Sequence, residues 1–111
     1  QPLDEIILGA FERGESPVLV AADGITDVRN LGAIARSAEC FGAHALILPE
    51  RGSASINEGA IKSSSGALLR LPVCRVSSIS GALELLIQSG VKCIALSEKS
   101  DVDLTDHNIS P

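Results

Sequence analysis

The sequence predicts an α/β domain with a mainly parallel sheet flanked by helices. Between residues 18 and 97, short apolar runs alternate with longer segments whose apolar residues recur at helical spacing. The runs are apolar throughout, as in strands that are covered on both faces of a sheet. Such alternation is typical of parallel strands joined by right-handed crossovers. The chain holds two Phe and no Trp or Tyr, so its core must consist of aliphatic side chains.

The chain begins with a predicted helix at residues 2–13, where apolar residues recur every three or four positions. Pro2 suits the first turn of this helix, and Gly14 suits its end. The apolar run at residues 18–22 then predicts the first strand.

A second helix is predicted at residues 30–41. Asn30 is a favourable N-cap, because its side chain can accept a hydrogen bond from an early backbone N–H group. Gly42 suits the end of the helix. The apolar stripe of this helix comprises Leu31, Ile34, Ala35, Ala38 and Phe41.

The rest of the chain continues the alternation of strands and helices. The sequence predicts a strand at 45–48 that ends at Pro49, then a polar loop at 51–57 and a helix at 58–69 that is interrupted at 63–66. A strand follows at 73–76, and then a helix at 79–87 that Gly90 closes. The last predicted elements are a strand at 91–96 and a polar segment at 97–111.

Charge limits how this chain can bind a nucleic acid. The net charge is −5, and the nine Lys and Arg residues are scattered along the sequence. Nucleic-acid-binding domains usually carry a basic stripe. If RNA is the substrate, most of the affinity for it must come from segments outside this chain or from a partner subunit.

Cysteine and histidine usage predicts a cytoplasmic protein without a metal site. Cys40, Cys74 and Cys93 lack Cys-x-x-Cys spacing, and such an odd, apolar-embedded set is typical of reduced thiols. His44 and His107 each stand alone, so they predict no cluster of metal ligands. No apolar run approaches the ~18 residues of a membrane span.

The common nucleotide-binding and hydrolase motifs are absent. The sequence contains no G-x-G-x-x-G after the first strand, no G-x-x-x-x-G-K-[ST] loop and no G-x-S-x-G elbow. The usual phosphate-cradling loops are therefore excluded.

Residues 23–42 are the strongest candidate for a functional site. They lead from the first strand into the second helix, and ligands gather at the carboxyl ends of strands in α/β domains. We expect Asn30, Gly32 and Arg36 at this strand–helix junction. The helical neighbours of Arg36 include Gly32, Ala33 and Cys40, which are small, so a partner helix, another segment or a substrate should pack there.

Each of these residues also has a plain structural interpretation. Asn30 can act only as a cap, Gly32 can serve only helix packing, and Arg36 can be a surface or salt-bridge residue. Asp23 and Asp27 are common turn residues. Composition and spacing alone therefore predict an α/β domain with a polar junction and leave its role open.

The sequence D-G-I-T-D-V-R-N-L-G-A-I-A-R-S-A-E-C-F-G at 23–42 resembles the first motif of the SpoU (TrmH-type) RNA 2′-O-ribose methyltransferases. Within it, Asn30, Gly32 and Arg36 fall on the family's N-x-G-x-x-x-R. The family usually has Asp-Pro before the Asn region, where this chain has Asp27 and Val28. Since Val cannot pre-set the turn as Pro does, we expect a looser turn without loss of activity.

Two further segments support the resemblance. H-A-L-I-L-P at 44–49 is similar to the family's second strand and following turn, and K-S-S-S-G-A-L-L-R-L-P-V at 62–73 is similar to its Ser-Gly-Ala segment before a Leu-Pro-Val strand. The resemblance implies a SPOUT fold, in which the C-terminal part of the α/β sheet forms a trefoil knot.

The resemblance also implies how the chain is organised. Residues 1–16 would be a linker with a short helix, and residues 17–111 would be a partial catalytic domain. Neither of the two motifs that build most of the family's S-adenosylmethionine site is present, so we expect the isolated chain to be inactive and the knot to be incomplete. The family's homodimer, formed through the knot, implies a partner subunit near Arg36.

The resemblance assigns roles to individual residues. It implies that Arg36 and Asn30 are catalytic and that Asp27 and Gly32 lie at the substrate, with ribosomal RNA as first choice and transfer RNA as second. The cofactor would contact the turn after the fourth strand: Leu96, Ser97 and Glu98. Arg titrates above ~12, so it is a poor base at neutral pH. Two roles for Arg36 therefore stay open: it could act as a base if its pKa were strongly depressed, or its cation could stabilise the developing alkoxide or hold a phosphate.

Two other interpretations compete with an RNA methyltransferase. A catalytically silent RNA-binding or dimerisation module could keep the same fold, although the joint presence of Asn30 and Arg36 favours an enzyme. An unrelated receiver-like domain would need an acidic cluster at the first strand and a phosphoacceptor Asp at the end of a central strand. Asp23 alone does not meet that requirement.

Overall fold

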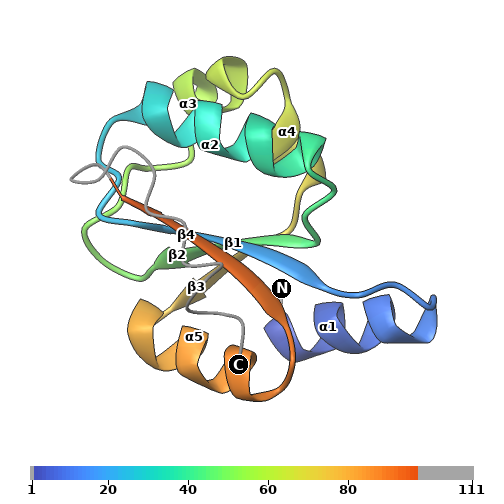
Figure 1. Cartoon of the computed structure of the whole chain (residues 1–111). Helices are drawn as coiled ribbons and strands as arrows, with labels where there is room; N and C mark the ends of the chain where they lie inside the picture. The colour runs from blue at the N-terminus through green and yellow to red at the C-terminus, as the bar shows by residue number, and fades with distance from the viewer. Residues whose placement is uncertain (1, 98–111) are drawn as a thin grey trace.

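The computed structural model describes residues 2–97 and confirms the predicted α/β class (Figure 1). Strand and helix alternate through the four strands, as the sequence predicted. The elements are α1 (Leu3–Glu12), β1 (Val18–Asp23), α2 (Val28–Cys40), β2 (Ala45–Pro49), α3 (Glu58–Ser63), α4 (Ala67–Arg70), β3 (Val73–Val76), α5 (Ile79–Gln88) and β4 (Lys92–Ser97).

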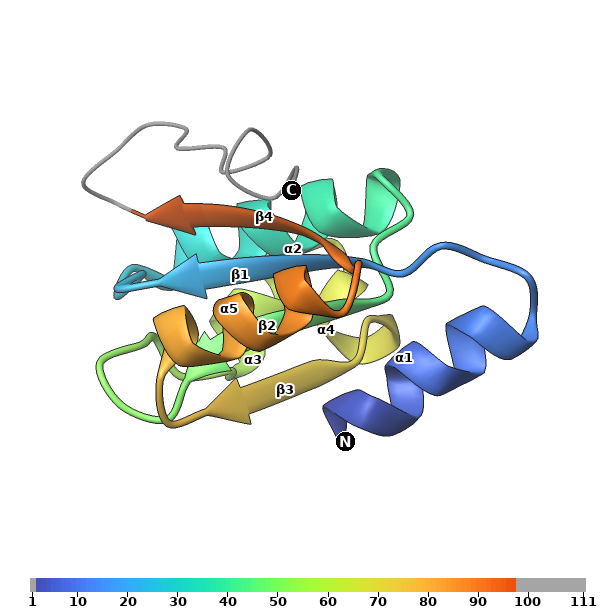
Figure 2. The ribbon, with the colours of Figure 1, turned by 60° about the horizontal axis from the view of Figure 1, so that its bottom comes forward.

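The four strands form a parallel sheet in the order β3-β2-β1-β4, and the strand arrows of Figure 2 point the same way. Because β1 is central, Leu19 pairs with Ala45 on one side and with Cys93 on the other. The chain moves outward from β1 through β2 to β3, and then crosses to the opposite edge for β4. This reversal creates a topological switch point between the carboxyl ends of β1 and β4.

Helices cover both faces of the sheet, with α2, α3 and α4 on one face and α1 and α5 on the other (Figure 1). Successive residues of β1 enter opposite cores, so Val20 joins the core beneath α2 while Leu19 and Ala21 join the core beneath α5. This explains the continuously apolar strand, since both of its faces are buried. Leu3, Ile6 and Ile7 pack against the second core, which makes α1 part of that layer.

The interruption predicted at 63–66 is a tight turn between α3 and α4. Ser64 is fully buried there. Its Oγ donates a hydrogen bond to the Ile61 carbonyl oxygen at 2.7 Å and accepts one from the Leu68 N–H group at 3.2 Å. The Ser64 hydroxyl thus substitutes for backbone hydrogen bonds that are missing where the helix is interrupted between α3 and α4.

One expectation about the core was wrong. Phe41 does not belong to the buried stripe of α2, because its side chain is 71% exposed just beyond the last helical residue. Phe11 is half-exposed and lies at the groove between α1 and α5. The apolar core is accordingly built from aliphatic residues, alanine and cysteine.

Candidate functional site

Asp27, not Asn30, caps the helix that carries the candidate site. Its carboxylate accepts hydrogen bonds from the backbone N–H groups of Arg29 at 2.7 Å and Asn30 at 3.3 Å. The predicted N-cap was therefore wrong by three residues, because an Asp at this earlier position satisfies the free N–H groups first. Asn30 lies exposed in the first turn of α2.

The turn between β1 and α2 is anchored in the protein. Ile25 is buried, and its carbonyl oxygen accepts a hydrogen bond of 2.7 Å from the Ala54 N–H group in the loop after β2. Val28 occupies the first helical position, where the proline of the family motif would fit. Burial and capping thus hold the turn in a sequence that lacks that proline.

Gly32 allows α2 and α3 to approach very closely. A Cβ atom on Gly32 would lie 2.5 Å from the Ser63 Cβ and 2.9 Å from the backbone N of Ser64. The close approach expected at this glycine is therefore made by another backbone segment of the chain. Glycine is the one residue that leaves this space free.

Arg36 lies in the middle of α2 rather than at the strand–helix junction. It lies six positions after Asn30, or roughly 9 Å along the helix axis. It lines a cleft of about 340 Å³ together with Ala33, Ser37, Cys40, Phe41 and Ser63. Within residues 2–97 its exposed guanidinium makes no hydrogen bond or ion pair, so it is free to bind a ligand.

Glu39, which lies three residues after Arg36, is a site residue that no sequence motif revealed. Helical spacing makes the two residues neighbours, yet the Glu39 carboxylate is bound by Arg70 of α4. The Arg70 Nε atom donates to one carboxylate oxygen at 2.6 Å, and Nη2 donates to the other at 2.7 Å. These bonds lower the pKa of Glu39 below its usual value and raise the pKa of Arg70, although partial desolvation opposes both shifts.

The predicted cofactor residues lie at a separate place, at the end of β4. Ser97 pairs with Asp23 across the carboxyl ends of β4 and β1, which is the switch point of the sheet. Leu96 is half-buried and packs against the core beneath α2. Glu98 lies outside the described residues. The junction at Asp27 and Asn30 follows β1 at the same edge of the sheet.

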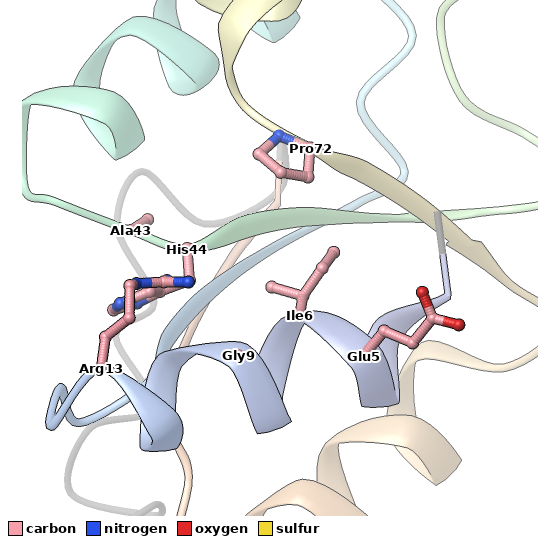
Figure 3. Close-up of a pocket in the computed structure, with 7 residues that line it drawn as sticks. All are labelled: Glu5, Ile6, Gly9, Arg13, Ala43, His44 and Pro72. Carbon is pink, nitrogen blue, oxygen red and sulfur yellow. The ribbon is translucent and has the colours of Figure 1, made fainter.

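A second hollow, of about 510 Å³, lies between α1 and the amino-terminal ends of β2 and β3 (Figure 3). Here His44 Nδ1 accepts a hydrogen bond from the Val18 N–H group at 3.0 Å, so the ring proton resides on Nε2. Nε2 donates to Glu15 at 2.9 Å, and Arg13 also binds this carboxylate. The cluster joins the end of α1 to the start of β2, far from Ser97 along the strands.

The three cysteines form no disulfide bond and lie in different environments. Cys40 is exposed beside Arg36, whereas Cys74 and Cys93 are buried in the core beneath α5. Burial raises the pKa of both buried thiols, that of Cys93 to about 11. Across residues 2–97, no three His, Cys, Asp or Glu side chains gather as metal ligands.

Between residues 2 and 97, no helix combines the length and the apolar character that crossing a membrane requires.

Comparison with known proteins agrees with the fold. The SpoU methyltransferase AviRb of Streptomyces viridochromogenes, solved with AdoMet, matches with a TM-score of 0.65 and 22% identity over 97% of this chain and 51% of that chain. A structure described as an RNA 2′-O ribose methyltransferase matches with a TM-score of 0.63 and 20% identity, over 85% of this chain and 44% of that chain.

Relatives of higher identity are also known. An uncharacterized tRNA/rRNA methyltransferase of Mycobacterium sp. (strain KMS) is 38% identical over 93% of this chain and 33% of its own length. A second, from Synechocystis sp., is 47% identical over 79% of this chain and 23% of its own length. The chain thus spans about a third or less of these curated relatives. The model of the SpoU rRNA Methylase family matches residues 17–110, and the chain therefore belongs to this family.

Proposed function

We propose that the protein containing this chain methylates a ribose 2′-hydroxyl of RNA, with ribosomal RNA as first choice and transfer RNA as second. The observation that carries the proposal is the free guanidinium of Arg36 in its cleft on α2. The relatives named as tRNA/rRNA methyltransferases support an RNA substrate, and the structural neighbour described as an RNA 2′-O ribose methyltransferase supports the ribose.

The proposed cofactor is S-adenosylmethionine, which is bound in the AviRb structure. When bound, it supplies an electrophilic methyl group on sulfur. Leu96 and Ser97 suit one wall of a nucleoside site, because they place an apolar side chain and a hydroxyl at the switch point of the sheet. Together with Glu98 they are the residues that we assign to the cofactor, and the remaining walls must come from outside residues 2–97.

Arg36 is proposed to act as a cation. The ribose 2′-oxygen would lose its proton to solvent and attack the methyl carbon, while the carbon–sulfur bond breaks and S-adenosylhomocysteine leaves. Negative charge therefore develops on the 2′-oxygen before the new C–O bond is complete. A guanidinium stays protonated in proteins and can stabilise this charge or grip the adjacent phosphate. Asn30 and Asp27, at the start of the same helix, are proposed to contact the RNA, while Gly32 sets the position of α3 beneath the cleft.

We further propose that two copies of the protein associate near Arg36 and act in the cytoplasm. The exposed side chain of Phe41 at the edge of the Arg36 cleft supports such an interface. Three cysteines outside disulfide bonds fit a reducing compartment. Sedimentation of Phe41→Asp in the full-length protein should show loss of the dimer, whereas an unchanged sedimentation coefficient would contradict an interface at this place.

Methyl transfer by the full-length protein tests the main proposal. Arg36→Ala should lower transfer of a labelled methyl group from S-adenosylmethionine to RNA by roughly 100-fold, the scale of losing one preorganised charge. Arg36→Lys should keep part of the activity, because it retains a cation. Lys92→Ala, which removes an exposed charge at the start of β4, is the matched control.

The product must also be identified. Nucleoside mass spectrometry should find 2′-O-methylribose, and a methylated base would overturn the ribose assignment. RNA binding with no methyl transfer at all by the wild-type protein would instead favour the catalytically silent RNA-binding module.

A further inference from the structure

Arg36 and Glu39 are positioned to form an ion pair that does not form. Residues three apart on a helix are surface neighbours, and oppositely charged side chains at this spacing attract each other. The Glu39 carboxylate is partly exposed, with 33% of its side chain accessible, so it could turn toward Arg36. Both of its oxygens are instead bound to Arg70.

The segment around Arg70 is shaped to hold this guanidinium in place. Ser65 and Gly66 both adopt left-handed backbone conformations, with φ angles of 55° and 84°. This turn directs the Ser65 carbonyl oxygen to the Arg70 Nη2 atom at 3.2 Å. The φ angle of 84° favours glycine at position 66, and a Cβ atom there would also stand 2.8 Å from Nη1, so the Arg70 guanidinium would have to shift.

Arg70 therefore makes three hydrogen bonds from one planar fork, two to Glu39 and one to Ser65. A bidentate guanidinium–carboxylate pair is geometrically specific, so it fixes the orientation of the Glu39 carboxylate and compensates its charge. The result is an asymmetric group of three charges, in which Glu39 is neutralised by Arg70 and the charge of Arg36 is uncompensated.

We propose that Arg70 is a positioning residue for Arg36. By binding the Glu39 carboxylate, Arg70 prevents Glu39 from pairing with Arg36 and leaves the Arg36 guanidinium available to bind RNA. The inference rests on the proposed function of Arg36. It also assigns a role to the S-S-S-G-A-L-L-R segment at 63–70: the turn at Ser65 and Gly66 orients the Arg70 side chain toward α2.

Charge rescue in the full-length protein tests this role. Arg70→Ala should lower methyl transfer by roughly two- to fivefold, the factor that corresponds to a surface ion pair between Glu39 and Arg36. Glu39→Gln should stay close to wild type, because no carboxylate is present to compete. The double variant Glu39→Gln/Arg70→Ala should regain most of the lost activity, although it lacks the link between α2 and α4 entirely.

Two additional readouts separate this role from a merely structural one. In Arg70→Ala, the new ion pair would join Glu39 and Arg36, and salt would screen it. The loss of methyl transfer, expressed relative to wild type at each ionic strength, should therefore become smaller as the salt concentration rises. In an Arg36→Ala background, Arg70→Ala should cause no further loss, since the guanidinium that Glu39 would capture is gone. Melting temperatures should fall equally in Arg70→Ala and in the double variant, so stability would not explain the rescue.

The outcomes are distinguishable. If the double variant is as impaired as Arg70→Ala, or if Glu39→Gln is equally impaired, the link between α2 and α4 is structural and the inference is overturned. If Arg36→Ala lowers methyl transfer but Arg70→Ala does not, only the role of Arg70 fails. If Arg36→Ala has no effect, the proposed function of Arg36 fails, and the role of Arg70 fails with it.

Discussion

Gly32 of α2 touches Ser63 of α3 so closely that a methyl group on the glycine would stand 2.5 Å from the Ser63 Cβ. Ser63 also lines the Arg36 cleft, so this helix contact determines one wall of the cleft. The shape of the proposed site therefore depends on a residue that is itself buried.

Gly32→Ala should destabilise the protein by about 1–3 kcal/mol, because backbone atoms of Ser63 and Ser64 must move to admit the methyl group. Denaturant unfolding measures the change. Gly9→Ala is the matched control, since its Cβ would meet only the flexible end of Arg13, and helix propensity should make it neutral or slightly stabilising. Equal effects of the two substitutions would contradict the importance of the α2–α3 contact.

Asp27 has both a structural role and a proposed contact with RNA, and two substitutions separate them. Asp27→Ala should cost about 1 kcal/mol of stability, because the Arg29 and Asn30 N–H groups lose their acceptor. Asp27→Asn should keep the cap and the unfolding free energy. Loss of methyl transfer in Asp27→Asn at full stability would assign the carboxylate a role in substrate binding, and unchanged activity would leave it as a cap.

The Glu15 carboxylate should titrate below its ordinary value of 4.5 in an NMR pH titration. Its pKa is lowered chiefly by the hydrogen bond from His44 and secondarily by that from Arg13. The stabilisation from this cluster is present above the unfolded pKa and is lost as pH falls through the lower folded pKa. His44→Phe should return the pKa toward 4.5 further than Arg13→Ala does, and the opposite order would contradict this assignment.

The buried thiols should make the fold sensitive to alkaline pH. Burial raises the pKa of Cys93 from 9.0 to about 11, so the thiol stays neutral in the folded state while it ionises in the unfolded chain. This contribution to stability is complete below pH 9 and is lost as pH rises toward 11. The chain contains no Tyr, which would otherwise titrate in the same range.

Cys93→Val should weaken this alkaline loss, as measured by unfolding free energies at pH 8 and pH 10.5. Labelling with iodoacetamide at pH 8, followed by peptide mapping, should modify the exposed Cys40 and leave Cys93 unmodified until the protein is denatured. Labelling of Cys93 at the rate of Cys40 would show that the core opens under native conditions.

Sequence patterns predicted the elements well where local chemistry decides them. The strand at 73–76 and the break at 63–66 follow from apolar runs and from Ser-Gly turn chemistry, both readable over a few residues. The cap of α2 was predicted at Asn30 because Asn and Asp are comparably good caps, and only the actual start of the helix separates them.

The state of the candidate site could not be predicted in the same way. Whether Arg36 is free depends on which cation binds Glu39, and that cation is Arg70, which lies 31 residues further along the chain. No local pattern contains such a pairing, since it arises only when α4 packs on α2. The exposure of Phe41 likewise depends on where the helix ends, which apolar spacing does not reveal.

The central position of β1 has a consequence for how the protein is made. β1 leaves the ribosome well before β4, because Leu19 and its partner Cys93 lie about 70 residues apart in the sequence. At ~5–20 residues per second, synthesis leaves one edge of this apolar strand unpaired for roughly 4 to 15 s. The nascent chain therefore spends seconds with an apolar strand edge unpaired, and a chaperone that shields apolar strands would act in this interval.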